Sequence, residues 1–284
     1  MSYYHIDKNT LKNLVGFGVA GNFAGHLEQA GETPDFVNVK TASSHAPKGL
    51  FPYYVTGSDK QVGQYPLSST EIHYPKNLED NAHLQAEPEV SILFDVSYDE
   101  GKIIQLTPKA FTAFNDCSIR KPGAKKISDK KNWGASTKGI SEDFIELNSF
   151  KPSCELDTFH IASFLKRDGL IHAYGKDSSV LTYSYFHEQL NDWMIERLNN
   201  QQDFGPLENL HQILKQASYP QSIMISLGAT AYTEFGEKVF LQPGDELTIY
   251  VYDASQNSAE NVFAHLIGEQ DQLINSSILK QTIV

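Results

Sequence analysis

Cysteine is scarce in this sequence. The chain of 284 residues has two cysteines, Cys117 and Cys154, and neither lies in the CxxC or CxxH spacing of a zinc site. Two cysteines are too few for the disulfide framework that stabilises small secreted domains. We therefore expect a protein of a reducing compartment, the cytoplasm, in which carboxylates rather than thiols supply the chemistry of any site.

Positive charge and long apolar segments are also lacking. The sequence carries 23 Lys and Arg residues against 35 Asp and Glu residues, which gives a formal net charge of −12. Because nucleic acids and anionic membranes are bound through a surplus of Lys and Arg, this balance argues against both as main partners. No apolar run approaches the roughly twenty residues that a membrane-spanning helix needs. The first residues, MSYYHIDKNTLKNL, also lack the basic-then-apolar layout of a signal peptide.

The patterning that is present favours strands over helices. Two short apolar runs, residues 90–96 and 103–106, flank Tyr98-Asp99-Glu100-Gly101, which is a good hairpin turn. A later run alternates apolar and polar residues over 247–251 and predicts another strand. Apolar residues three or four apart predict two helices, over 183–200 and 207–217. Strands on both sides of a helical stretch, without strict alternation, predict an α+β fold that is predominantly β.

The first 80 residues differ in character from the rest. They are rich in Gly, Pro, Tyr and Ser, so we expect an irregular N-terminal region over residues 1–80 and one larger domain over 81–284. Within the first region, Gly16-Phe17-Gly18-Val19-Ala20-Gly21 matches the GxGxxG pattern of dinucleotide-binding folds. No acidic residue closes a second strand about twenty residues later, and β-α alternation is missing. A glycine-rich turn is therefore the better interpretation.

Three acidic residues form a candidate metal site. Glu87 and Glu89 are two residues apart at the start of a predicted strand, so their side chains would point to the same face. Asp116 follows another apolar stretch. Carboxylates with no Cys or His nearby in sequence favour Mg²⁺, Mn²⁺ or Ca²⁺ over zinc. On spacing alone, the alternative of a solvated strand face remains open, because such pairs of acids are common there.

These acids belong to a longer series of motifs. In chain order they are Asn22-Phe23-Ala24-Gly25-His26, Glu87-Pro88-Glu89-Val90, Asn115-Asp116-Cys117-Ser118-Ile119-Arg120, Lys131-Asn132-Trp133, Gly228-Ala229-Thr230-Ala231 and Leu241-Gln242-Pro243-Gly244-Asp245. Six motifs in one order are far more specific than any one alone. With this series the sequence resembles the fumarylacetoacetate hydrolase (FAH) superfamily, as a divergent member.

The resemblance implies a fold, a metal and a set of roles. The fold would be a mixed β-sandwich roll with a few peripheral helices. Glu87, Glu89 and Asp116 would bind a divalent cation, Mg²⁺ or Mn²⁺ and in some members Ca²⁺, that polarises a carbonyl and stabilises an enolate. Arg120 would hold an anionic substrate, and Lys131 would neutralise the developing negative charge.

The segment around His26 would be a mobile lid. In hydrolytic members this His activates a water molecule together with a Glu three residues later, but here that position is Gln29 and the acid is Glu28. One residue turns a helical side chain by about a hundred degrees. Either the lid is not helical and Glu28 still serves as a catalytic partner of His26, or the pair is broken.

The substrate-facing positions depart most from the family. The family's Lys after the lid has no counterpart, and Tyr53 or Tyr54 would line that wall instead; Thr230 would line the pocket from the late turn. The resemblance thus implies a hydrolase or lyase that cleaves a C–C bond of, or decarboxylates, a small 2-oxo acid or 1,3-dicarbonyl. A non-catalytic ligand-binding relative and an isomerase or hydratase of an unsaturated 2-oxo acid remain alternatives. Homodimers are common in the family.

Overall fold

The largest of three sheets carries most of the strands that the sequence predicts. The computed structural model describes residues 1–284 and places nine strands in this sheet. Its path runs through β1 (Tyr3–Tyr4), β11 (Phe144–Glu146), β8 (Lys102–Asn115), β7 (Pro88–Asp99), β14 (Ser222–Ser226), β2 (Val15–Ala20) and β3 (Gly49–Val55). Off this path, β10 (Lys138–Ile140) pairs with both β8 and β4 (Leu67–Ser68).

A long hairpin forms the centre of this sheet. Strands β7 and β8 pair antiparallel from Pro88 opposite Asn115 to Asp99 opposite Lys102. At the turn both Glu100 and Gly101 have positive φ, the conformation of the tight turns that match strand twist. The expected hairpin is therefore present, with longer strands than the apolar runs alone suggest.

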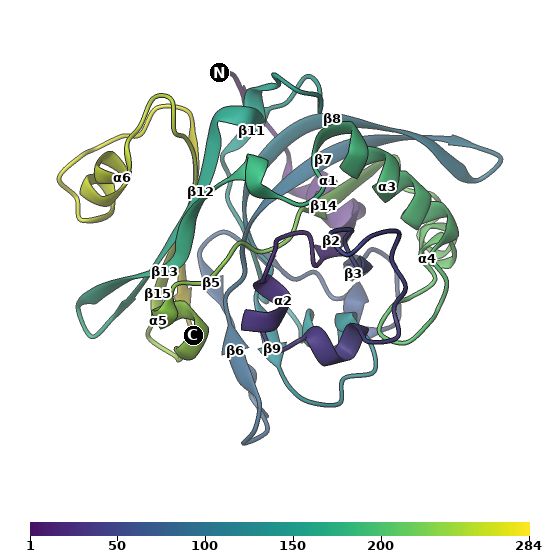
Figure 1. The fold of residues 1–284 in the computed structure, drawn as a ribbon, viewed down its shortest axis with the longest axis horizontal. Coiled ribbons are helices and arrows are strands. Elements are labelled where there is room, and N and C mark those ends of the chain that lie inside the picture. Colours follow the sequence, from purple (N-terminus) through teal and green to yellow (C-terminus); the bar gives the residue numbers. More distant parts are fainter.

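The second sheet packs against the first, and a small third sheet lies beside them (Figure 1). The strand order of the second sheet is β13 (Leu170–Ser179), β12 (Phe159–Arg167), β15 (Glu246–Asp253), β16 (Ser276–Ile283) and β5 (Glu71–Ile72). The small sheet pairs β6 (His83–Gln85) with β9 (Ser118–Arg120). Side chains from both large sheets share one core of 45 buried residues, in which the rings of Phe111 and Phe159 meet edge to face.

The helices are few and lie around the sheets. They are α1 (Lys8–Asn13), α2 (His26–Gln29), α3 (His187–Asn200), α4 (Leu210–Gln216), α5 (Glu234–Lys238) and α6 (Ala259–Leu266), with short 3-10 helices at Thr33–Phe36, Gln61–Gly63, Ile127–Lys130, Glu155–Thr158 and Val180–Thr182. Helices α3 and α4 lie on the opposite side of the molecule from α6 (Figure 1). No helix is both long and apolar enough to cross a bilayer. The prediction of an α+β, predominantly β fold is confirmed.

The glycine-rich segment near the N-terminus is mostly a strand. Gly16 and Gly18 lie inside β2, where an added Cβ would collide with the rings of Tyr53 and Phe51 from the neighbouring strand β3. Only Gly21, at φ 74°, takes the turn conformation that the sequence suggested. The interpretation as a glycine-rich turn is thus wrong for the first two glycines. Their role is to let aromatic rings lie flat over β2.

Candidate functional site

The open end of the β7–β8 hairpin brings three carboxylates together. Glu87 and Glu89 flank the first residue of β7, and Asp116 follows the last residue of β8. The backbone N–H of Asp116 donates to the carbonyl oxygen of Glu87 at 3.0 Å, which fixes the two chain ends side by side. One oxygen of each of the three carboxylates lies within 4.8 Å of the others. They are grouped as the ligands of a divalent cation would be.

Cationic side chains hold two of these carboxylates from both sides. The Lys131 Nζ lies 2.7 Å from Oε2 of Glu87 and 2.6 Å from Oδ2 of Asp116. The Arg120 Nη2 lies 2.7 Å from Oε1 of Glu87, and the Lys138 Nζ lies 3.3 Å from Oδ1 of Asp116. Both oxygens of Glu87 and both of Asp116 therefore already face a cationic nitrogen. Although burial alone would raise it, Lys131 and Arg120 lower the pKa of Glu87 far below its ordinary value.

Lys138 is a residue of this cluster that sequence reasoning missed. Its side chain is fully buried, and its Nζ also donates to the carbonyl oxygen of Cys117. Burial lowers its pKa, and Asp116 opposes that shift. The sequence around it, Thr137-Lys138-Gly139-Ile140-Ser141, carries no signal of a site, and the basic stretch before it drew attention to Lys131 instead.

Glu89 differs from its two neighbours because no cation pairs with it. Its Oε2 accepts a hydrogen bond from the backbone N–H of Gly228 at 2.9 Å. Burial, and then the negative charges of Asp116 and Glu87, raise its pKa well above the ordinary value. Glu89 thus favours its protonated form in this arrangement.

The segment from Gly21 to Phe36, here called the lid, covers these groups. His26 is buried in it, and its Nδ1 lies 3.0 Å from the carbonyl oxygen of Thr230. Burial lowers the pKa of His26 below 6.5, so the ring favours its neutral form. Glu28 is exposed and does not reach the site. The acid that does is Glu32, four residues further on.

Glu32 ties the lid to the floor of the site. Its Oε1 lies 2.7 Å from Nη1 of Arg120 and 2.6 Å from Nζ of Lys130. Against the opposing effect of burial, these two cations lower the pKa of Glu32 to about 2. The second acid near Lys130 is Asp35, whose Oδ2 lies 2.9 Å from the Nζ. The ion pairs of Glu32 with Arg120 and Lys130 could not be predicted from the sequence. No regular helix connects His26 with Glu32, so helical spacing does not indicate that this acid faces the site.

The two tyrosines of β3 point to different places. Tyr53 is fully buried, packs its ring against Phe114, and has no hydrogen-bond partner for its hydroxyl. Tyr54 shares an apolar cluster with Tyr53, but its hydroxyl donates to the carbonyl oxygen of Lys12, whereas the charges of Asp116 and Glu89 act on Tyr53. Thr230 is buried, and its hydroxyl has no partner either. Of the expected wall residues, the structure therefore brings Tyr53 and Thr230 to the buried site and not Tyr54.

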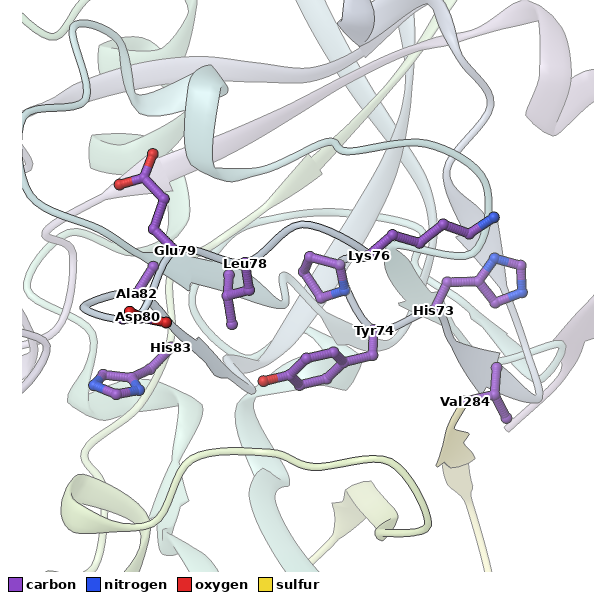
Figure 2. Close-up of a pocket in the computed structure, with 10 residues that line it drawn as sticks. His73, Tyr74, Lys76, Leu78, Glu79, Asp80, Ala82, His83 and Val284 are labelled. Atoms are coloured by element: carbon purple, nitrogen blue, oxygen red, sulfur yellow. The ribbon is translucent and has the colours of Figure 1, made fainter.

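Little space remains under the lid. A cavity of about 20 Å³, roughly one water molecule in size, is lined by lid residues together with Glu87, Lys131 and Ala229. A pocket of about 870 Å³ lies elsewhere, along the segment from His73 to His83 with Val284 at one end (Figure 2). None of the clustered charged residues lines that larger pocket. A substrate could reach the cluster only if the lid opened.

The carboxylate oxygens of Glu87, Glu89 and Asp116 are ligands of the kind that a hard divalent cation prefers, but two of these acids already contact Arg and Lys nitrogens. The charged groups of this buried cluster are four acids and four cations: Glu32, Glu87, Glu89 and Asp116, against Arg120, Lys130, Lys131 and Lys138. With Glu89 ionised their formal charges balance, and with Glu89 protonated, as its raised pKa favours, the cluster carries one net positive charge. A divalent ion would add uncompensated charge in a low-dielectric interior and would have to share Glu87 and Asp116 with nitrogen atoms already in contact. In this arrangement the residues therefore do not fit the ion that the FAH resemblance implies.

The chain matches one protein family over most of its length, and several solved structures have a similar fold. Residues 32–283 match a family described as "Family of unknown function (DUF5718)". No curated protein matches the sequence. Among solved structures, an HpcE-type protein from Mycobacterium smegmatis is 15% identical, with a TM-score of 0.56 over 96% of this chain and 76% of that chain. A protein assigned to the fumarylacetoacetate hydrolase family from Yersinia pestis CO92 is 14% identical, with a TM-score of 0.52 over 95% of this chain and 94% of that chain.

A 2-keto-3-deoxyarabinonate dehydratase shares the fold as well. It is 13% identical, with a TM-score of 0.52 over 95% of this chain and 72% of that chain. The resemblance noted in the motifs is thus confirmed by the three-dimensional structure. The chain belongs to the DUF5718 family, and its fold is similar to that of FAH-family proteins.

Proposed function

We propose that the protein is an FAH-type enzyme that acts on a small anionic 2-oxo acid or 1,3-dicarbonyl and stabilises an enolate as a C–C bond breaks or carbon dioxide leaves. The observation that carries the proposal is the cluster of buried charged side chains beneath the lid. Burying a charge is unfavourable by several kcal/mol even after relaxation. Strongly shifted groups gathered in one place are therefore more typical of functional sites than of ordinary cores.

The cationic side chains provide the electrostatic part of this chemistry. Arg120 and Lys130 already bind a carboxylate, that of Glu32, and the same nitrogens would bind the carboxylate of a substrate. Lys131 lies deeper, against Glu87 and Asp116, and would face the enolate oxygen. A fixed cation aimed at developing negative charge lowers the activation barrier without reorganisation.

His26 is the proposed base. A carbonyl oxygen can only accept, so the contact with Thr230 requires the proton of the neutral ring to be on Nδ1. Nε2 then keeps a free lone pair. Burial keeps the ring in this neutral form near neutral pH. His26 can therefore accept a proton from water or substrate, while exposed Glu28 has no part in orienting it.

Substrate binding requires the lid to exchange partners. In the closed form Glu32 occupies the two cations that a substrate carboxylate would use. An anionic ligand would release Glu32, and the lid with it, and then close again over the reacting atoms. This supports an acid, rather than a neutral ketone, as the substrate class.

The name of one structural neighbour supports the 2-oxo acid. That protein is a 2-keto-3-deoxyarabinonate dehydratase, so the shared fold accommodates such a compound in at least that case. A dehydratase or isomerase reaction of an unsaturated 2-oxo acid would use the same groups here. It differs in where the proton returns, which product analysis distinguishes.

The test is turnover of a panel of acylpyruvates, oxaloacetate and 2-keto-3-deoxy sugar acids. We expect wild type to consume at least one, and Lys131→Met to lose that activity while Lys125→Met keeps it, since Lys125 is an exposed lysine of the same basic stretch. If wild type and Lys131→Met bind these acids with equal affinity and turn over none of them, the protein is the non-catalytic ligand-binding relative instead.

A further inference from the structure

We infer that Lys138, together with Lys131, takes the charge-balancing place of a divalent cation, so that the acidic group of Glu87, Glu89 and Asp116 does not bind Mg²⁺ or Mn²⁺. The inference concerns the site of the proposed function but does not depend on it, because ion binding is measured without a substrate. It rests on contacts, burial and the count of charges.

The pairing of β10 fixes Lys138 at this point. Gly139 pairs antiparallel with Asn115, so Lys138 lies next to Asp116 by register and not by a chance rotamer. The backbone N–H of Lys138 also donates to the carbonyl oxygen of Pro66, across the parallel pair with β4. A strand held on both sides cannot easily withdraw its side chain.

The side chain of Lys138 has no route to water. It is fully buried, with Nζ against Asp116 Oδ1, beside the carbonyl oxygen of Cys117 and 5.4 Å from the centre of the Trp133 ring. Each of these neighbours attracts a cation. A long amine that could reach solvent would exchange with an incoming metal ion, but this one is enclosed by groups that favour it where it is.

Lys131 closes the remaining approach. It bridges Glu87 and Asp116, the two carboxylates that come from opposite strands of the hairpin. Octahedral Mg²⁺ needs oxygen atoms about 2.0–2.1 Å away and would lie close to both ammonium groups if it used Asp116. Only Glu89 has no cationic partner, and a single carboxylate is a poor site. The acids are thus retained, but their counter-charge comes from the chain itself.

The experiment is equilibrium dialysis of Mn²⁺ against chelator-treated protein, read out by electron paramagnetic resonance of free Mn²⁺. Four proteins are compared: wild type, Asp116→Asn, Lys131→Gln combined with Lys138→Gln, and these two lysine substitutions combined with Asp116→Asn. Gln can still donate a hydrogen bond toward Cys117 while it removes the charge. Lys125→Gln, at an exposed lysine, is the matched control.

We expect no stoichiometric Mn²⁺ on wild type or Lys125→Gln, uptake by the Lys131→Gln, Lys138→Gln variant at least about tenfold tighter than by wild type, and loss of that uptake when Asp116→Asn is added. Stoichiometric binding to wild type that Asp116→Asn abolishes would overturn the inference, and this arm needs no variant of Lys138. A folded Lys131→Gln, Lys138→Gln variant that binds no better than wild type would overturn it too. Lys131→Met combined with Lys138→Met repeats the comparison if the Gln variant does not fold.

The outcomes separate this inference from the enzyme proposal. Mn²⁺ bound at Asp116 in wild type would overturn the inference about the ion and would leave the enzyme proposal standing. Failure to turn over any acid, with wild type free of Mn²⁺, would overturn the enzyme proposal and leave the inference standing.

Discussion

Glu32 and Arg120 join the lid to the floor of the buried site through a contact of 2.7 Å between Oε1 and Nη1. Arg120 also contacts Glu87 at 2.7 Å, so one guanidinium connects the lid with the acidic group below it. The fork geometry of Arg suits two carboxylates at once, which Lys could not bind in the same way. We therefore expect opening of the lid to rearrange the site through this residue.

Substitution Glu32→Gln should loosen the lid. It leaves Arg120 and Lys130 short of one buried negative charge, and removing one partner of a buried pair destabilises by about 3 kcal/mol. We expect faster amide hydrogen exchange over residues 21–36 and a lower melting temperature. Glu28→Gln is the matched control, because Glu28 lies on the same lid but is exposed. Equal exchange in the two variants would contradict the role of Glu32.

Acid should open the lid of the wild type as well. The pKa of Glu32 is about 2 in the folded protein, against an ordinary value of 4.5, so the carboxylate is bound more tightly than its protonated form. Its contribution, roughly 3 kcal/mol, is fully present above pH 4.5 and is lost as the pH falls toward 2. Relative to the intrinsic exchange rate at each pH, the hydrogen-exchange protection of residues 21–36 should fall in the wild type as the pH is lowered from 5. In Glu32→Gln this pH dependence should be absent; if it persists, another group controls the lid.

The acidic group was predictable because its geometry is local. Residues just before β7 and just after β8 must meet at the open end of an antiparallel hairpin, whatever the rest of the fold does. Glu87, Glu89 and Asp116 could therefore be grouped from spacing and motif alone. The same logic located Lys131 only with the help of the family resemblance, since it lies in a loop.

Lys138 and Glu32 could not be predicted for the opposite reason. Lys138 meets Asp116 through the register of β10 against both β8 and β4, a three-strand arrangement that no local pattern specifies. Glu32 follows a single turn of α2 and an irregular connection. Sequence reasoning considered only Glu28 as the partner acid of His26, or a broken pair, and did not consider Glu32. Tyr53 and Tyr54 are adjacent on a strand and point to opposite faces. Without the orientation of that strand, either of them could have been the residue that lines the site.

Substitution Lys131→Met should abolish catalysis rather than binding. If Lys131 stabilises the enolate, kcat/KM should fall by about a hundredfold or more, the loss typical of one oxyanion donor, with most of the fall in kcat. Removal of the ammonium also leaves Glu87 and Asp116 facing each other with less compensation, so the variant should melt at a lower temperature. Steady-state kinetics on any substrate found in the panel, with Lys125→Met beside it, give the measurement. An unchanged kcat would rule out this role.

The pH profile should identify His26 as the base. Its burial lowers the pKa from 6.5, and a base must be unprotonated, so activity should hold as the pH falls to 6.5 and decline only below it. His26→Asn keeps a donor for the carbonyl oxygen of Thr230 but removes the second ring nitrogen, so it should leave KM near the wild-type value, lower kcat by about a hundredfold and abolish the acid limb. Because Glu32 also titrates under the lid, the profile must be repeated in Glu32→Gln. If the fall in activity at low pH disappears in Glu32→Gln but survives in His26→Asn, it reports lid opening, and His26 is not the base.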